Sequence, residues 1–176
     1  VVLNDEIHYA RNVMKTNTTT VQTFVSINRG PAGVVNTGKI QWFEPMDRKV
    51  GPATGFSVDA LDKLPRVDVI YAHANMSADL IDAAIKNGAK GLVIAGVGDG
   101  NMTTPALDAV TRAAKSGIVV VRSTRLASGI TLRNNEVNDD EKGLVASGEL
   151  NPAKSRVLLQ LALTQTNDPV QIQRMF

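Results

Sequence analysis

The second half of the chain alternates short apolar segments with amphipathic ones, and this alternation limits the folds open to it. Segments 67–72, 90–96 and 118–122 are too short for helices, and the last two are almost continuously apolar. A strand without a polar face is buried on both sides of its sheet. Between them lie segments 77–88 and 104–117, whose apolar residues recur with helical periodicity. Strands alternating with helices at this spacing predict a parallel sheet covered by helices.

The expected ends of these helices are marked by residues that start or stop helical backbone. Gly88 and Gly117 follow the two helical segments. Glycine commonly occupies the first position after a helix because it adopts positive φ without a steric penalty. Thr104 is the expected N-cap of the second helix, and Pro105 is its expected first residue.

The end of the chain contains a helix start signal twice. Asn151–Pro152 and Asp168–Pro169 each join an N-cap side chain to a proline, whose missing N–H has no partner at a helix start. We expect a helix after each pair, and a short fourth strand over residues 144–147. Residues 66–176 are therefore predicted to form a small α/β domain with a parallel sheet and flanking helices.

Residues 1–43 have a pattern typical of β-structure instead. Segments 1–4 and 20–27 are rich in β-branched residues. Residues 32–43 predict a hairpin with its turn at 36–38, because apolar residues flank a glycine-containing turn. We interpret this region as the β-rich end piece of a preceding domain.

Residues 44–65 are predicted to be an interdomain linker, because they contain three prolines, two glycines and little periodicity. The predicted organisation is thus the end of one domain over 1–43, the linker, and a C-terminal α/β domain over 66–176. The chain begins inside an apolar run, Val1–Leu3, without an initiating Met. We therefore expect it to be part of a longer polypeptide.

The composition argues against several classes of function. Nineteen Lys and Arg residues stand against 17 Asp and Glu, a net charge of only +2; the charges are scattered, and the chain has seven aromatic residues. A nucleic-acid surface would need clustered positive charge with stacking rings, so we expect no nucleic-acid partner. The absence of cysteine excludes disulfides and thiolate chemistry. No apolar run approaches the roughly 20 residues that cross a bilayer, so we expect no membrane partner.

Ligands of open parallel sheets bind outside the carboxyl ends of the strands, which indicates where a site should lie. Loops 72–75, 96–101 and 123–129 leave those ends, and the polar loop 132–143 could fold over the same edge. The polar side chains of the first three loops are expected to lie near one another: Asn75, Asp99, Asn101, Ser123 and Thr124.

The loop GVGDGN, residues 96–101, carries three glycines but does not match a phosphate-binding motif. The dinucleotide fingerprint is G-x-G-x-x-G, and here the spacing is G-x-G-x-G. The lysine and hydroxyl of a phosphate loop are absent, and the carboxylate of Asp99 would repel a phosphate. Three readings remain open: the glycines only permit a tight turn, the loop contributes to a site for an amino acid or another polar ligand, or, as the least favoured, it binds a nucleotide.

Metal binding is not indicated by the remaining candidates. His8 and His73 stand alone, and the run NDDE at 138–141 lacks the spacing of a calcium loop, so we interpret that run as a solvated loop and expect no metal. Lys15 lies among hydroxyl residues. It is either an ordinary surface charge or, if buried, a base that could take a proton from a hydroxyl nucleophile.

Several segments together resemble the C-terminal half of the bacterial type II L-asparaginases, a glutaminase-asparaginase family of homotetrameric amidohydrolases usually found in the periplasm. The resemblance covers essentially the whole chain. It rests on VVLNDEIHYARNVMKTN, LPRVDVIYAHAN, AGVGDGNM, VVRSTR and ASGELNPAKSRVLLQLALTQTNDPVQIQRMF. It implies that the first segment ends a larger N-terminal α/β domain, and that the enzyme uses no cofactor.

The resemblance also implies roles for particular residues. The family's threonine nucleophile would lie in the N-terminal half. Lys15 matches the lysine of a catalytic Thr-Lys-Asp triad. Glu136 matches a glutamate that supports a Thr-Tyr-Glu arrangement and, with Asn101, receives the substrate's α-ammonium group in a neighbouring subunit. An amide oxygen and a carboxylate are suitable acceptors for an ammonium. Asn101 also favours L-asparagine over L-glutamine, since strong glutaminases of the family commonly carry Ser there.

Two departures from the family pattern stand out. The usual loop is G-x-G-N-G-N, whereas this chain has Asp99 at the first Asn position, and its added charge could disturb or assist the ammonium site. The segment RKVGPATGF, residues 48–56, lacks a usual His-Thr, from which we expect no chemical effect. If the 176-residue chain acted alone it would lack a nucleophile. It would then be an inactive α/β module for ligand binding or subunit interaction.

Overall fold

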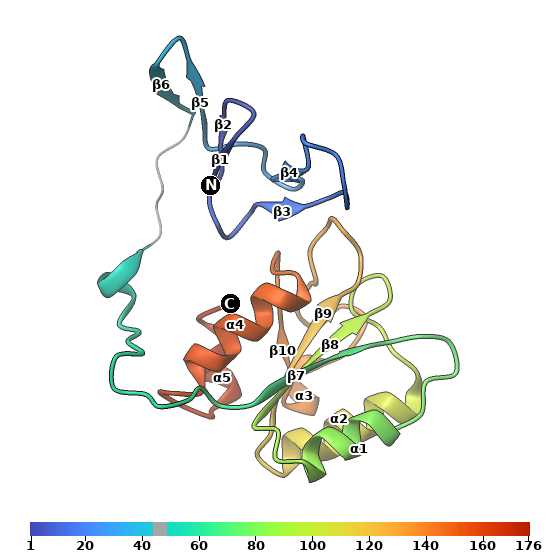
Figure 1. The fold of residues 1–176 in the computed structure, drawn as a ribbon. Coiled ribbons are helices and arrows are strands. Elements are labelled where there is room, and N and C mark those ends of the chain that lie inside the picture. The colour runs from blue at the N-terminus through green and yellow to red at the C-terminus, as the bar shows by residue number, and fades with distance from the viewer. Residues whose placement is uncertain (44–48) are drawn as a thin grey trace. The chain divides into compact units, whose positions relative to one another are not determined.

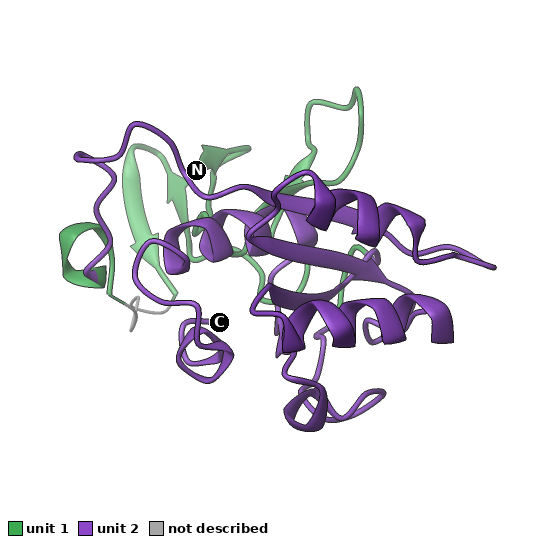
Figure 2. Cartoon of the chain, turned by 90° about the horizontal axis from the view of Figure 1, so that it is seen from below, with its two compact units in different colours: residues 1–54, 127–129 green, residues 55–126, 130–176 purple. Residues whose placement is uncertain are grey.

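The computed structural model describes residues 1–43 and 49–176, which form two compact units (Figure 2). The first unit is 1–54 together with loop residues 127–129, and the second is 55–126 with 130–176. The described part of the predicted linker, residues 49–65, contains the 3₁₀ turn η1 at Gly51–Thr54. The first residues of the linker, 44–48, lie outside the described residues, including the start of the RKVGPATGF segment. The predicted linker and domain boundaries stay a prediction.

The first unit consists of short antiparallel strands. Its larger sheet has the order β1-β2-β5-β6, and β3 pairs with β4 separately. The bounds are β1 Val2–Leu3, β2 Glu6–Ile7, β3 Met14–Lys15, β4 Phe24–Val25, β5 Gly33–Asn36 and β6 Lys39–Trp42. The predicted β-character of residues 1–43 is therefore confirmed, although the strand expected over 20–27 is reduced to two residues.

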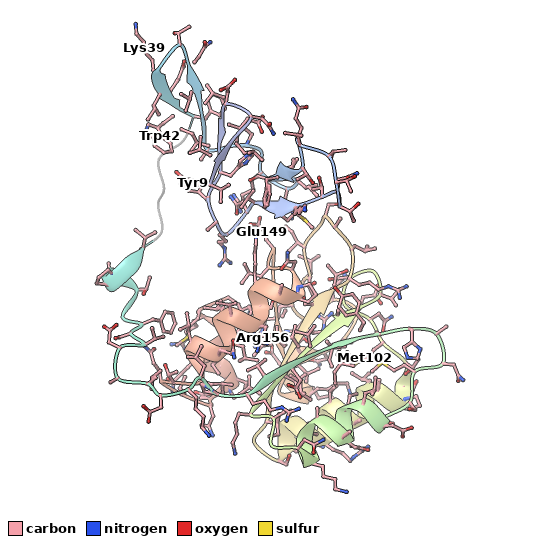
Figure 3. The ribbon with its side chains drawn as sticks, viewed as in Figure 1. Tyr9, Lys39, Trp42, Met102, Glu149 and Arg156 are labelled. Carbon is pink, nitrogen blue, oxygen red and sulfur yellow. The ribbon has the colours of Figure 1, made fainter. Side chains whose placement is uncertain are left out.

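The predicted hairpin is the pair β5–β6. Thr37 and Gly38 form its two-residue turn with φ of 49° and 74°. Two successive positive φ values characterise the type I′ turn, whose twist matches that of the flanking strands. Lys39 lies at the tip of this hairpin and Trp42 nearer its base (Figure 3).

The second unit contains a four-stranded sheet of order β10-β9-β8-β7, in which every neighbouring pair is parallel. The strands are β7 Val67–Tyr71, β8 Gly91–Gly96, β9 Val119–Thr124 and β10 Val145–Ala146. Every residue of β8 and β9 is buried. The predicted parallel sheet is confirmed, and strand β9 extends two residues beyond the expected Arg122.

Helices cover both faces of this sheet (Figure 1). Helices α1, Asp79–Lys86, and α2, Thr104–Lys115, lie on one face; α4, Pro152–Ala162, and α5, Pro169–Gln173, lie on the other. Successive residues of β8 point to opposite faces, so each side of the strand packs into its own apolar cluster. Leu92 packs with Ile81, whereas Val93 packs with Leu159. Full burial of one such side chain contributes about 1.5–3 kcal/mol. The α/β class is confirmed.

Most of the predicted helix ends are confirmed. The side chain of Asn151 accepts a hydrogen bond from the Lys154 N–H at 2.9 Å, and that of Asp168 accepts one from the Val170 N–H at 2.9 Å. Gly88, which follows α1, has a positive φ of 87°. These are the cap geometries that the sequence indicated.

The predicted N-cap of α2 is wrong by one residue. Thr103 is the N-cap, with extended backbone at φ −65° and ψ 153°, and Thr104 is the first helical residue. The reason is a tertiary contact, because the Thr103 hydroxyl donates to the Met76 carbonyl at 2.7 Å. Pro105 remains in the first turn, where its missing N–H costs nothing.

The expectation of a solvated loop at 138–141 is also wrong. Residues Asp139–Lys142 form the short helix α3, whose N-cap Asn138 accepts from the Glu141 N–H at 3.2 Å. Asp139 is completely buried. Within residues 1–43 and 49–176, no helix combines the length and apolar character needed to span a bilayer.

Candidate functional site

The glycines of loop 96–101 permit a tight reversal directly after β8. The backbone N–H of Val97 donates to the Asn101 carbonyl at 2.8 Å, and the Asn101 N–H donates back at 2.7 Å. Gly98 and Gly100 have φ of 55° and 77°. A Cβ on Gly96 would lie 2.4 Å from the backbone carbon of Gly100, so a side chain is excluded there. The turn requirement therefore accounts for the three glycines without a bound phosphate.

Asp99 joins this loop to the segment that begins at Leu132. One of its carboxylate oxygens accepts from the Leu132 N–H at 2.7 Å, and the other accepts from Nδ2 of Asn135 at 2.7 Å. The Asp99 backbone carbonyl accepts from Nη1 of Arg122. Loop 132–143 thus lies against loop 96–101, an arrangement that its polar sequence allowed.

Asn101 and Glu136, two of the predicted site residues, are brought together by these loops. Nδ2 of Asn101 donates to Oε2 of Glu136 at 3.3 Å, although the two residues are 35 positions apart. Oδ1 of Asn101 accepts from the Met102 N–H at 2.8 Å, which fixes the orientation of the amide. Both side chains are exposed. The Glu136 carboxylate, and the lone pair of Oδ1 of Asn101 that Met102 does not use, can accept hydrogen bonds from a cationic ligand group.

A buried ion pair lies beneath these loops, and the sequence reasoning missed it. Nε and Nη2 of Arg122 donate to the two carboxylate oxygens of Asp139 at 2.8 and 2.7 Å, and both side chains are 0% exposed. Nη2 of Arg122 also donates to the Leu132 carbonyl at 2.8 Å, and Asp139 accepts from the Asn134 N–H at 2.9 Å. The available signal was an arginine at the end of an apolar strand, because a charge in such a position needs a partner.

The exposed side of loop 132–143 is held by a second carboxylate. Nδ2 of Asn134 donates to Asp140 at 2.6 Å, and Arg133 forms an ion pair with the same carboxylate. The hydrogen bond from Asn134, and then the hydrogen bond and charge of Arg133, hold the pKa of Asp140 below its ordinary value. Asn134 itself has a positive φ of 56°, a conformation that asparagine tolerates better than most residues.

Other polar residues predicted for this edge have different roles. Ser123 is buried, and its hydroxyl donates to the Leu150 carbonyl at 3.0 Å. The Thr124 hydroxyl accepts from the Leu126 N–H at 3.1 Å. Asn75 is exposed at a positive φ of 57°. We expected all five residues to cluster. Two of them, Asp99 and Asn101, are hydrogen-bonded to loop 132–143.

The remaining candidates lie in the first unit or at the surface. Lys15 is exposed and pairs with Phe24 across strands β3 and β4, and its catalytic role stays a prediction. His8 is buried with Nδ1 2.9 Å from Oγ of Ser26. His73 is exposed. Across the described parts of the chain, no three His, Cys, Asp or Glu side chains are grouped so that they could hold a metal ion.

Comparison with known families supports the resemblance seen in the sequence. Residues 66–176 match the family model described as the glutaminase/asparaginase C-terminal domain, and residues 1–48 match the asparaginase N-terminal model. The chain belongs to the asparaginase family. The predicted resemblance is thereby confirmed over both of its parts.

Curated members of the asparaginase family align along the whole chain. It is 48% identical over 176 residues to a probable periplasmic L-asparaginase of Haemophilus influenzae and 49% identical over 176 residues to L-asparaginase 2 of Escherichia coli. It is 38% identical over 179 residues to the glutaminase-asparaginase of Acinetobacter glutaminasificans. The alignments include 100% of this chain but 50%, 51% and 54% of these relatives. The chain thus spans about half the length of the curated relatives it matches.

Proposed function

We propose that these residues belong to an L-asparaginase, an amidohydrolase that converts L-asparagine to L-aspartate and ammonia, with L-glutamine as a secondary substrate. The relatives named L-asparaginase and glutaminase-asparaginase support this activity. The observation that carries the proposal is the contact between Asn101 and Glu136, which places a side-chain amide and a carboxylate together at the loops following a parallel sheet.

In the proposed site, Asn101 and Glu136 recognise the substrate's α-ammonium group. An ammonium has three donors and no acceptor, so it needs oxygen atoms around it and a negative charge nearby. Oδ1 of Asn101 keeps a second lone pair besides the one that accepts from Met102. The Glu136 carboxylate supplies further acceptors and the countercharge. This arrangement selects amino acids over simple amides.

The chemical step is proposed to use a threonine of the N-terminal half. Its hydroxyl oxygen attacks the side-chain amide carbon, and Lys15 helps to remove the hydroxyl proton. The C–N bond then breaks, and the amide nitrogen takes up one proton and leaves as ammonia. Water then hydrolyses the acyl-enzyme, releases L-aspartate and restores the threonine. Backbone N–H groups would stabilise the oxyanion of each tetrahedral intermediate. Glu136 would additionally support a Thr-Tyr-Glu arrangement. The roles of Lys15 and Glu136 rest on the family motifs that these positions match.

We further propose a periplasmic homotetramer in which Asn101 and Glu136 complete the active site of a neighbouring subunit. The word periplasmic in the name of one relative supports the location. Several apolar side chains in loops near these two residues are exposed, which is typical of surfaces that contact another protein. They are Val97 at 42%, Ile130 at 49% and Leu132 at 51%.

The test uses the full-length gene product and follows ammonia release from L-asparagine. We expect Glu136→Gln to lower kcat/KM by about 10- to 100-fold, because a hydrogen bond to a charged group contributes about 1.5–3 kcal/mol. Glu141→Gln is the matched control, since Glu141 is an exposed carboxylate five residues further along, in helix α3, and we expect it to retain activity.

Two outcomes would contradict the proposal. A wild-type protein that releases no ammonia from L-asparagine or L-glutamine would favour the alternative of a non-catalytic binding or interaction module. Equal activity in the wild type and Glu136→Gln would remove Glu136 from the site while leaving the enzymatic activity in place.

A further inference from the structure

The carboxylate of Asp99 uses both of its oxygens on one neighbouring segment. The Leu132 N–H donates to one oxygen and the Asn135 side chain donates to the other, each at 2.7 Å. These two anchors lie at the two ends of segment 132–135, and Glu136 is the next residue. The backbone at Glu136 is therefore placed by an anchor on the residue directly before it, Asn135.

Glu136 itself is held by a weaker contact. Its carboxylate accepts a hydrogen bond from Nδ2 of Asn101 at 3.3 Å, between two exposed side chains. Such exposed contacts compete with water and fix a side chain only when the backbone beneath is already placed. Arg122 supports the same backbone from the buried side, because it donates to the carbonyls of both Asp99 and Leu132. The two loops are thus joined on their exposed side by Asp99 and on their buried side by Arg122.

We propose that Asp99 is a positioning residue that places Glu136 beside Asn101, so that the two act as one acceptor pair for the substrate's α-ammonium group. This inference rests on the proposed asparaginase function. Asp99 acts through Leu132 and Asn135 and has no assigned contact with substrate. Asp99, which stands where the family usually has Asn, therefore has a structural role at this position.

The hydrogen-bonding capacity of Asp99 suggests how its role can be separated from its charge. A carboxylate accepts at both oxygens, and its two partners are both donors. In Asp99→Asn, the amide oxygen can still accept from the Leu132 N–H, and the amide nitrogen can donate to Asn135 once the Asn135 amide rotates. Asp99→Ala removes both anchors. Asp99→Asn is thus the conservative substitution that should keep the anchoring of segment 132–135.

The experiment compares two substrates in the full-length protein: L-asparagine and succinamate, which is the same amide without the α-amino group. We expect Asp99→Ala to lower kcat/KM for L-asparagine by about 10-fold, because a displaced recognition group loses much of its effect. For succinamate we expect a change of less than about 3-fold, since no ammonium is recognised. Asp99→Asn should stay within about 3-fold of the wild type for both substrates.

Two further variants complete the series. Asn135→Ala removes one of the two anchors and should reduce the preference for L-asparagine over succinamate by a smaller factor than Asp99→Ala does. Combined with Asp99→Ala it should cause no further loss, because the two side chains share one interaction. Asp82→Ala is the matched control, because Asp82 is an exposed carboxylate of helix α1 whose ion pair with Arg112 spans 3.6 Å. We expect this control to behave as the wild type.

Hydrogen exchange provides a readout that does not depend on catalysis. The amide of Leu132 should exchange about 10-fold faster or more in Asp99→Ala, because its acceptor is lost. If the Leu132 amide exchanged at the same rate in Asp99→Ala as in an active wild type, the anchoring of Leu132 by Asp99 would be overturned. Faster exchange with equal losses for both substrates would overturn the ammonium role. Absence of ammonia release from the wild type would overturn the proposed function, and the exchange result would still report on the anchor.

Discussion

The pairs Arg122–Asp139 and Asn101–Glu136 each include one residue of segment 132–143 but differ in their contact with solvent. Arg122 and Asp139 are fully buried and share two hydrogen bonds of 2.7 and 2.8 Å, whereas Asn101 and Glu136 are exposed and share one of 3.3 Å. The other hydrogen bonds of the buried pair are made to the backbone of the loops. The exposed pair keeps free acceptors. A rigid, buried support beneath an open pair of acceptors is a suitable arrangement for a ligand site.

The largest effect is expected from breaking the buried pair. Arg122→Met leaves Asp139 buried without its countercharge and should lower the free energy of unfolding by about 3–5 kcal/mol. Urea denaturation of the full-length protein measures this loss. Adding Asp139→Leu to Arg122→Met should recover part of it, because no uncompensated charge remains.

The control for that experiment is an exposed ion pair in the same unit. Arg66 and Asp68 are 2.8 Å apart, with 49% and 27% of their side chains exposed. Arg66→Met should cost no more than about 1 kcal/mol. An equal loss for Arg66→Met and Arg122→Met would show that the buried pair gives the loops no special stability.

A smaller and pH-dependent effect is expected from Asp140 on the exposed side of the loop. Its pKa is lowered in the folded protein by Asn134 and Arg133, so its stabilising contribution is present above its ordinary pKa of 3.8 and is lost as the pH falls through the folded value. Asp140→Asn should therefore be slightly less stable than the wild type at pH 7, with the difference shrinking below about pH 4. Urea midpoints at pH 7 and pH 3 test this. A difference that grows in acid would contradict the sign.

The parallel sheet could be predicted because its signals are local. The apolar runs at 90–96 and 118–122 and the start pairs Asn151–Pro152 and Asp168–Pro169 each specify an element from a few neighbouring residues. The α/β class followed from their alternation. The family resemblance was confirmed, whereas the catalytic role of Lys15 stays a prediction.

The contacts that build the candidate site could not be predicted, because they join residues far apart in sequence. Asp99 was unexplained until its partners, 33 and 36 residues further along, were placed beside it. Asp139 was expected to be solvated, as most carboxylates are, since only the fold shows that Arg122 of β9 lies 2.7 Å from it. The N-cap of α2 was wrong for the same reason, because the Met76 carbonyl that binds Thr103 comes from a different loop.

The central claim, that Asn101 and Glu136 recognise the α-ammonium group, is tested most directly by a crystal structure of the full-length protein with L-aspartate bound. We predict the ammonium nitrogen to lie about 2.7–3.2 Å from Oδ1 of Asn101 and from a carboxylate oxygen of Glu136. An ammonium bound by other residues, with both of these side chains beyond hydrogen-bonding distance, would contradict the claim.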